Sequence, residues 1–361
     1  MLKEGFFMIK RIEKLREKML EESLTSFLIT SPYNLRYLTG FTGTTGMAVI
    51  TLDDAYFITD FRYTEQASTQ CEGYEIVQNV GPIFDELIDL IDEKGIPNMA
   101  FEEAHVSFKE FVSLEMLLET ELVPISGMIE SLREVKDESE VVIIEQACEI
   151  ADKAFSHILT YIKPGMTEIQ VANELDFYMR SLGATGVSFE TIVASGVRSA
   201  MPHGVASDKI IEQGDLITID FGCYYNGYVS DMTRTISLGE PSQKLREIYE
   251  IVKEAQQKVL DVAKPGMTGV ELDAVARDHI ASKGYGEAFG HSTGHGIGLE
   301  IHEGPNVSRL AEKAFVPGNV ITNEPGIYLP GIGGVRIEDD MLVTENGIKR
   351  LTHSEKELII L

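Results

Sequence analysis

Acidic residues recur in matching words of the sequence, in a pattern suited to binding metal. Three words occur twice in the same order: KPGMT at 163–167 and 264–268, GDLITIDFG at 214–222 with GNVITNEPG at 318–326, and GYVSD at 227–231 with GVRIE at 334–338. Three matches in one order argue against chance recurrence of common turn words, and loop insertions account for their widening separation. The sequence therefore predicts two similar units, each a helix followed by a strand pair.

The repeat aligns carboxylates with carboxylates. It gives two pairs: Asp220 with Glu324, and Asp231 with Glu338. A two-fold arrangement of the units would bring these four acids to one centre. Any single acid is more often a solvated side chain, and that interpretation is kept for Asp339 and Asp340, which continue an acidic run. It is weaker for the four aligned acids, because three of them lie inside apolar strand patterns.

The dipeptide Asn226-Gly227 is a strong signal for a two-residue hairpin turn. Such a turn places Asp220 opposite Thr233, and it makes Asp220 and Asp231 diagonal neighbours on adjacent strands. Two like charges at that distance repel each other, and a bound cation would relieve the repulsion. The hairpin therefore favours a metal site over a purely structural role.

Four of the eight histidines stand in words rich in glycine or proline. His291 and His295 belong to GHSTGHGIG at 290–298, His302 to EIHEGP and His203 to MPHG. A lone histidine is more often a hydrogen-bonded polar residue than a ligand. Together with the aligned carboxylates, the set predicts a metal centre surrounded by acid–base groups.

The elements that must position these residues fall into two domains. Residues 1–125 alternate helix and strand signals, with a hairpin around residues 53–54, and predict a small mixed α/β domain. Residues 126–136 carry no strong pattern and are expected to be a linker. Asp137 is a candidate cap for a long helix that opens the second domain, residues 137–361. The expected fold class is α/β (α+β), with an internal two-fold pseudo-repeat in the C-terminal domain.

Composition narrows the classes of partner and location. The chain has 361 residues, of which 43% are apolar, with 31 basic and 58 acidic residues and a net charge of −27. A protein with this much negative charge repels phosphate backbones and anionic lipid. Nucleic acid and membranes are therefore not expected as partners. The three cysteines are widely spaced without a CxxC pair. They predict reduced, structural thiols in a cytoplasmic protein.

At these words the sequence resembles the pita-bread metallopeptidases, the group of aminopeptidase P, proline dipeptidase and methionine aminopeptidase. The matching words are ITIDFG, SDMTRT, GHSTGHGIGLEIHEGP, NEPGIY, GGVRIEDD and MPHGVASDK. The resemblance covers nearly the whole chain: the catalytic half from about residue 137, and a smaller N-terminal domain like that of aminopeptidase P and prolidase. It implies a pita-bread fold for the C-terminal domain.

The resemblance also implies the roles of individual residues. Five ligands would hold two divalent ions: Asp220, Asp231, His295, Glu324 and Glu338. Of these, Asp231 and Glu338 would bridge both ions. His203, His291 and His302 fall where the family places substrate-contacting and proton-handling histidines, and Arg336 where it has a supporting arginine. Asn323 departs from the family, in which an apolar residue more commonly precedes the ligand Glu324.

The implied donor set points to a class of ion and of reaction. Four carboxylates and one imidazole form a hard site suited to Mn²⁺, and also to Co²⁺, Fe²⁺ or Zn²⁺. A water shared by two ions would ionise near neutral pH and attack a peptide bond, with Glu324 accepting its proton. His203 and His302 would stabilise the oxyanion and hydrogen-bond the substrate.

From the family alone, the expected substrates are short peptides with proline at the second position, cleaved in the manner of an Xaa-Pro aminopeptidase by a homodimer. The main alternative is a strict Xaa-Pro dipeptidase, because the two share these motifs and differ in loops over the cleft. Methionine aminopeptidase generally lacks a domain like residues 1–125, and metal-free creatinase-type hydrolases lack the ligand set. A non-catalytic binding protein on the same fold is the alternative from another class, but such relatives typically lose ligands and carry a basic surface.

Overall fold

The computed structural model describes residues 4–361, and the chain divides into two compact units, one ending at Arg133 and the other beginning at Glu134. A short helix, α6 (Met128–Arg133), lies in the segment expected to be a linker and belongs to the first unit. Among the helices of the described residues, none has the length and apolar character required to span a bilayer.

The first unit is built around a six-stranded mixed sheet with the order β4-β3-β2-β1-β5-β6. Before α6, the helices and strands of this unit are, in chain order, α1 (Glu4–Glu21), β1 (Ser26–Ile29), α2 (Pro32–Thr39), β2 (Met47–Thr51), β3 (Ala55–Asp60), α3 (Thr64–Gln70), β4 (Glu75–Asn79), α4 (Ile83–Lys94), β5 (Asn98–Glu102), α5 (Phe108–Leu117) and β6 (Glu121–Ile125). The predicted hairpin joins β2 to β3, with Ile50 paired to Ala55. The mixed α/β character predicted for this part is confirmed.

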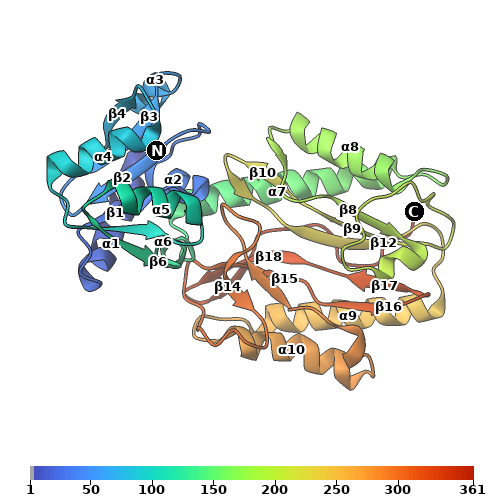
Figure 1. Cartoon of the computed structure of the whole chain (residues 1–361). Helices are drawn as coiled ribbons and strands as arrows, with labels where there is room; N and C mark the ends of the chain where they lie inside the picture. The colour runs from blue at the N-terminus through green and yellow to red at the C-terminus, as the bar shows by residue number, and fades with distance from the viewer. Residues whose placement is uncertain (1–3) are drawn as a thin grey trace. The chain divides into compact units, whose positions relative to one another are not determined.

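The second unit consists of two halves, each a pair of helices packed on strands. The first half contains α7 (Glu138–Tyr161), α8 (Glu168–Ser181), β7 (Gly186–Val187), β8 (Ile192–Ser195), the 3₁₀ turn η1 (Gly196–Ala200), β9 (Leu216–Phe221), β10 (Cys223–Tyr225), β11 (Tyr228–Val229) and β12 (Met232–Ser237). Two small sheets have the orders β12-β9-β8 and β11-β10-β7. Figure 1 shows α7 and α8 along one side of these strands.

The second half repeats this plan on the opposite side of the unit. It contains α9 (Gln243–Val262), α10 (Gly269–Ser282), the 3₁₀ turn η2 (Gly286–Ala288), β13 (Gly294–Gly296), β14 (Glu303–Val307), β15 (Val320–Asn323), β16 (Gly326–Leu329), β17 (Gly333–Arg336), β18 (Asp339–Thr344) and β19 (Gly347–Arg350). A five-stranded sheet has the order β14-β13-β15-β18-β19, and β16 pairs with β17. Figure 1 shows α9 and α10 along the other side of the strands from α7 and α8.

The repeat predicted from the sequence is visible in how α8 and α10 begin and end. Both helices have 14 residues, and both start with a capping box in which a threonine, Thr167 or Thr268, bonds the main chain three residues on. After each helix a glycine takes a left-handed conformation, with φ of 107° at Gly183 and 87° at Gly284. Asp137 caps α7 with a capping box of its own, as predicted.

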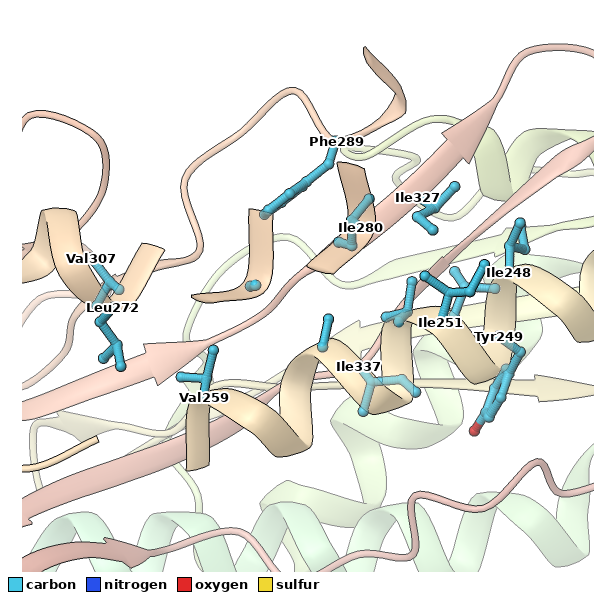
Figure 2. Packing of buried hydrophobic residues seen from close by; sticks show 14 of the residues in the cluster. Ile248, Tyr249, Ile251, Val259, Leu272, Ile280, Phe289, Val307, Ile327 and Ile337 are labelled. Carbon is cyan, nitrogen blue, oxygen red and sulfur yellow. The ribbon is translucent and has the colours of Figure 1, made fainter. Parts of the chain in front are cut away.

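The two cores leave a polar face between the halves. Ile217, Ile219 and Phe221 of β9 are fully buried in the core under α7 and α8. Because side chains alternate along a strand, Asp220 points to the opposite face. In the second half Ile321 of β15 joins the core around α9 and α10, a cluster in which Figure 2 labels Ile248, Leu272, Ile280 and Phe289. The strands thus turn their polar faces away from the helices.

Candidate metal centre

Asp220 and Asp231 come from the hairpin predicted around Asn226-Gly227. Both turn residues have positive φ, 45° and 80°, as a type I′ turn requires. In the ladder between β9 and β12, Asp220 pairs with Thr233, which confirms the predicted register. Asp220 is 8% exposed and Asp231 is 5% exposed, so the hairpin carries two carboxylates into the protein interior.

Glu324 and Glu338 occupy corresponding places in the second half. Glu324 follows β15 directly, and Glu338 directly precedes β18. Two hydrogen bonds join Glu338 to Thr233 of the first half: its N–H donates to the Thr233 carbonyl at 3.0 Å, and its Oε2 accepts from the Thr233 hydroxyl at 2.6 Å. The structure therefore brings acids of both halves together.

His295 enters the same group from the middle of β13. Its Nε2 lies 3.6 Å from Asp231 Oδ2 and 3.4 Å from Glu324 Oε1. One ligand atom each of Asp231, His295 and Glu338 lie within 4.8 Å of one another. The flanking glycines allow this approach, since a Cβ at Gly294 or Gly296 would lie 2.1 or 2.4 Å from a backbone oxygen of a neighbouring strand.

The electrostatics of the group fit a cation. Within residues 4–361, four carboxylate oxygens are buried without a hydrogen-bond partner, and three of them belong to this group: Asp220 Oδ1, Asp231 Oδ1 and Glu338 Oε1. The fourth is Oδ1 of Asp340. Burial, together with neighbouring carboxylates, raises the pKa of Asp231 and of Glu338 well above the ordinary range. Burial also lowers the pKa of His295 to about 4, which keeps its imidazole neutral. Unpaired oxygens and a neutral imidazole are the donors that divalent ions take.

The other predicted residues surround this group in one cleft. A cleft of about 470 Å³ is lined by Asp220, Asp231, His295 and Glu324, and also by His203, His291, His302 and Arg336. The rings of His295 and His302 are 4.4 Å apart between centroids. His291 donates to or accepts from the Tyr328 hydroxyl through Nε2 at 2.8 Å. Burial, chiefly, lowers the pKa of His291 to about 4.

Arg336 connects His291, through Tyr328, to the acid group. Its guanidinium donates to Asp220 Oδ2 at 2.6 Å, to the Tyr328 hydroxyl at 2.8 Å and to the Thr233 hydroxyl at 3.1 Å. It is 3% exposed. Tyr328 is a member of this network that the sequence analysis does not identify, because a tyrosine inside an apolar strand carries no signal of its own.

The expectation that Asp339 and Asp340 are solvated is wrong, because both are 0% exposed. They open β18, whose two faces are both covered: Asp339 contacts Gln256 of α9, and Asp340 contacts Cys148 of α7. Asp339 forms an ion pair with Arg234 at 2.7 Å. Asp340 Oδ2 accepts from the Asp231 N–H at 2.9 Å and so fixes the main chain of a predicted ligand.

Asn323, the departure noted beside Glu324, points away from the acid group. It is fully buried, and its Nδ2 donates to the carbonyl of Gln256 in α9 at 2.9 Å. The alternation along β15 sends Asn323 toward α9 and leaves Glu324 on the cleft side. The three cysteines are free and buried, in agreement with the prediction of structural thiols.

We expect protons and metal to compete at this centre. Burial, chiefly, raises the pKa of Glu324 to about 8, from an ordinary value of 4.5. Because of this group, the metal-free protein loses folding stability as the pH rises from about 4.5 toward 8. Metal binds the ionised form, so metal affinity rises with pH. The rise in Tm caused by saturating Mn²⁺ should grow by about 5 °C between pH 6 and pH 8. Thermal unfolding with Mn²⁺ and with a chelator across this range measures it, and a rise independent of pH would contradict the expectation.

Two family models match the chain. The description "Metallopeptidase family M24" covers residues 142–345, which include the whole acid and histidine group. The description "Creatinase/Prolidase N-terminal domain" covers residues 11–135. The two matches together account for both compact units.

Individual proteins are similar over nearly their full length. A curated protein named Xaa-Pro dipeptidase, from Pyrococcus furiosus, is 45% identical over 98% of this chain and 100% of its own. The solved structure of an Xaa-Pro dipeptidase from Bacillus anthracis has a TM-score of 0.97 and 53% identity, covering 98% of this chain and 100% of the other. That of an X-Pro aminopeptidase from Thermotoga maritima has a TM-score of 0.90 and 43% identity, covering 94% and 98%.

The family match extends over more than half of the chain, and the similar proteins align with both units. A pita-bread domain with two pseudo-symmetric halves, as the resemblance implied, carries the buried group of acids and histidine. The chain therefore belongs to metallopeptidase family M24, with a creatinase/prolidase N-terminal domain before its catalytic unit.

Proposed function

We propose that the protein is a metal-dependent exopeptidase that hydrolyses the bond between an N-terminal residue and a following proline. The observation that carries this proposal is the convergence of Asp231, His295 and Glu338 at a cleft that three further histidines line. Such a cleft combines a cation site with groups that handle protons. The similar proteins named Xaa-Pro dipeptidase and X-Pro aminopeptidase supply the substrate class.

The proposed ligands are the five residues that the resemblance implies. Asp220, Asp231, His295, Glu324 and Glu338 would hold two divalent ions, with Mn²⁺ as the preferred ion because four of the five donors are carboxylates. The orphaned oxygens of Asp220, Asp231 and Glu338 support this assignment. When bound, the ions would supply Lewis acidity, which polarises the scissile carbonyl and makes water more acidic.

The remaining chemistry falls to side chains of this chain. Glu324, as an ionised carboxylate beside the ions, would accept the proton of the attacking water. Arg336 fixes the outer oxygen of Asp220 through its hydrogen bond. His291, held by Tyr328, and His203 and His302 on the cleft wall would orient the substrate and stabilise its oxyanion.

The names of the similar proteins point to two substrate lengths. The names of the Pyrococcus furiosus and Bacillus anthracis proteins favour a dipeptidase, and the name of the Thermotoga maritima protein favours an enzyme that trims longer peptides. An Xaa-Pro dipeptide assayed beside the matching Xaa-Pro-Pro tripeptide distinguishes them. A dipeptidase cleaves the first and leaves the second intact, whereas an aminopeptidase cleaves both.

Substrate selection tests the proposed function itself. The Mn²⁺-loaded enzyme should hydrolyse Met-Pro. Its kcat/KM values for N-acetyl-Met-Pro and Met-Ala should be at least about 100-fold lower. The acetyl group removes the cationic amine that the acidic cleft attracts, and alanine removes the ring. Chromatography of the released amino acid measures all three, as methionine from Met-Pro and Met-Ala and as N-acetylmethionine from N-acetyl-Met-Pro. Equal rates for the three peptides would contradict the assignment to Xaa-Pro substrates.

The remaining proposals concern partners and location. The net charge of −27 argues against nucleic acid and anionic membranes as partners and against a basic, non-catalytic binding protein. The free, buried cysteines support a cytoplasmic location. The homodimer implied by the resemblance stays a prediction, because the structure describes one chain.

A further inference from the structure

An ion pair on α10 lies outside the proposed ligand set and contacts the loop that carries His291. Asp273 and Arg277 stand one helical turn apart, and two contacts of 2.7 Å join the carboxylate to Nε and Nη2 of the guanidinium. Asp273 is 1% exposed, and the side chain of Arg277 is 13% exposed. A pair this buried normally needs further hydrogen bonds to offset its lost hydration.

Those further hydrogen bonds all go to the loop of residues 289–293. Arg277 Nη1 donates to the Phe289 carbonyl at 3.0 Å, and Nη2 donates to the His291 carbonyl at 2.8 Å. Asp273 Oδ1 accepts from the Thr293 N–H at 3.0 Å and from its hydroxyl at 2.9 Å. The ion pair therefore binds the loop at every second residue: before the histidine, at it and after it.

The other contacts of the loop hold single points of it, such as the hydrogen bond of 2.8 Å between His291 Nε2 and the Tyr328 hydroxyl. The loop lies between η2 and β13, outside the strands, and Gly290 leaves its backbone flexible. Phe289 anchors one end, because its ring lies in the core cluster shown in Figure 2 and under the Arg277 guanidinium at 4.3 Å. The same ring meets His291 edge-on, with centroids 5.1 Å apart. The position of the His291 ring thus depends on groups that Arg277 contacts directly.

We propose that Asp273 and Arg277 form a positioning pair, which holds His291 in the orientation its role in the cleft requires. This inference rests on the proposed function, because that function gives His291 its role. A second connection extends the same effect toward the acids: the Thr293 carbonyl accepts from the Glu324 N–H at 2.8 Å. Neither residue of the pair lines the cleft, so both act through the loop.

Arg277→Lys tests the proposal, because lysine keeps the charge but cannot bond Asp273 and two carbonyls in one plane. In Mn²⁺-loaded enzyme it should lower kcat about 10- to 100-fold and change KM less than about 3-fold. In a His291→Ala background the same substitution should lower kcat less than about 3-fold further, since the group it positions is gone. An equal loss in both backgrounds would overturn the proposal.

Arg180→Lys is the matched control. Arg180 forms the same helical contact with Asp176 on α8, at 2.8 Å, and its Nη1 donates to the Thr185 carbonyl. It contacts a loop of the repeat that carries no proposed site residue. Its kcat should stay within about 2-fold of the wild type, because no group that it holds takes part in the reaction.

A measurement without activity or metal separates this proposal from the proposed function. In metal-free protein labelled with ¹⁵N-histidine, the His291 ring signal is identified by its loss in His291→Ala. Arg277→Lys should shift that signal, and Arg180→Lys should leave it in place. An unshifted signal would overturn the proposal even if the wild type cleaved Xaa-Pro peptides, and a shifted one would support it even if no such peptide were cleaved. If Arg277→Lys does not fold, Asp273→Asn, which keeps an acceptor for Thr293, is judged by the same results.

Discussion

Asp231→Ala should leave a folded protein that retains almost no divalent metal and has lost more than about 10³-fold in kcat/KM. Asp231 is close to both Glu338 and His295, and one of its oxygens is buried without a hydrogen-bond partner in the described chain. If it bridges two ions, as the resemblance implies, its removal takes a ligand from each. Wild type dialysed against Mn²⁺ should hold close to two ions per chain by elemental analysis.

The same variant makes a prediction about stability that a damaged fold would not share. Burial and the nearby carboxylates raise the pKa of Asp231, so in the metal-free state this residue is a cost to stability near neutral pH. In chelator, Asp231→Ala should therefore unfold at a temperature no lower than the wild type. Asp176→Ala, on the surface of α8, is the control and should keep both metal and activity. Full activity in metal-free wild type would contradict the metal site altogether.

Glu324→Gln should lose more than His302→Ala, and in a different way. A glutamine is a poor ligand and no base, so Glu324→Gln should weaken metal binding and lower kcat by more than about 10³-fold. His302 lies beside His295 without entering the acid group, so His302→Ala should lower kcat by about 10²-fold and keep its metal. Metal content and kcat measured on both variants check the division. Loss of metal from His302→Ala would mean that His302 is a ligand.

Local signals predicted much of the fold and the centre. The Asn226-Gly227 turn determined the pairing of Asp220 with Thr233, because turn length fixes the register of a hairpin. The repeated word KPGMT, whose threonines cap α8 and α10, helped to make the two halves recognisable. In each case the determining residues lie within a few positions of the feature they predict, so the sequence pattern contains the whole interaction.

Interactions between distant segments could not be predicted in this way. Asp339 and Asp340 have the composition of a surface run, and only the packing of α9 and α7 over the two faces of β18 buries them. Asp273 and Arg277 have the spacing of an ordinary exposed helix pair. Their contact with the loop of residues 289–293 arises because α10 packs beneath that loop, which no local pattern records.

The hydrogen bonds between Thr233 and Glu338 place the proposed centre on the seam between the two halves. Ions held by Asp220 and Asp231 on one side and by Glu338 on the other would close a loop of roughly 100 residues, the length at which a covalent cross-link restrains the unfolded chain by about 5 kcal/mol. The two halves would then have to separate at the metal centre before the protein could unfold. The metal-loaded protein would therefore unfold more slowly, in addition to any gain in its equilibrium stability.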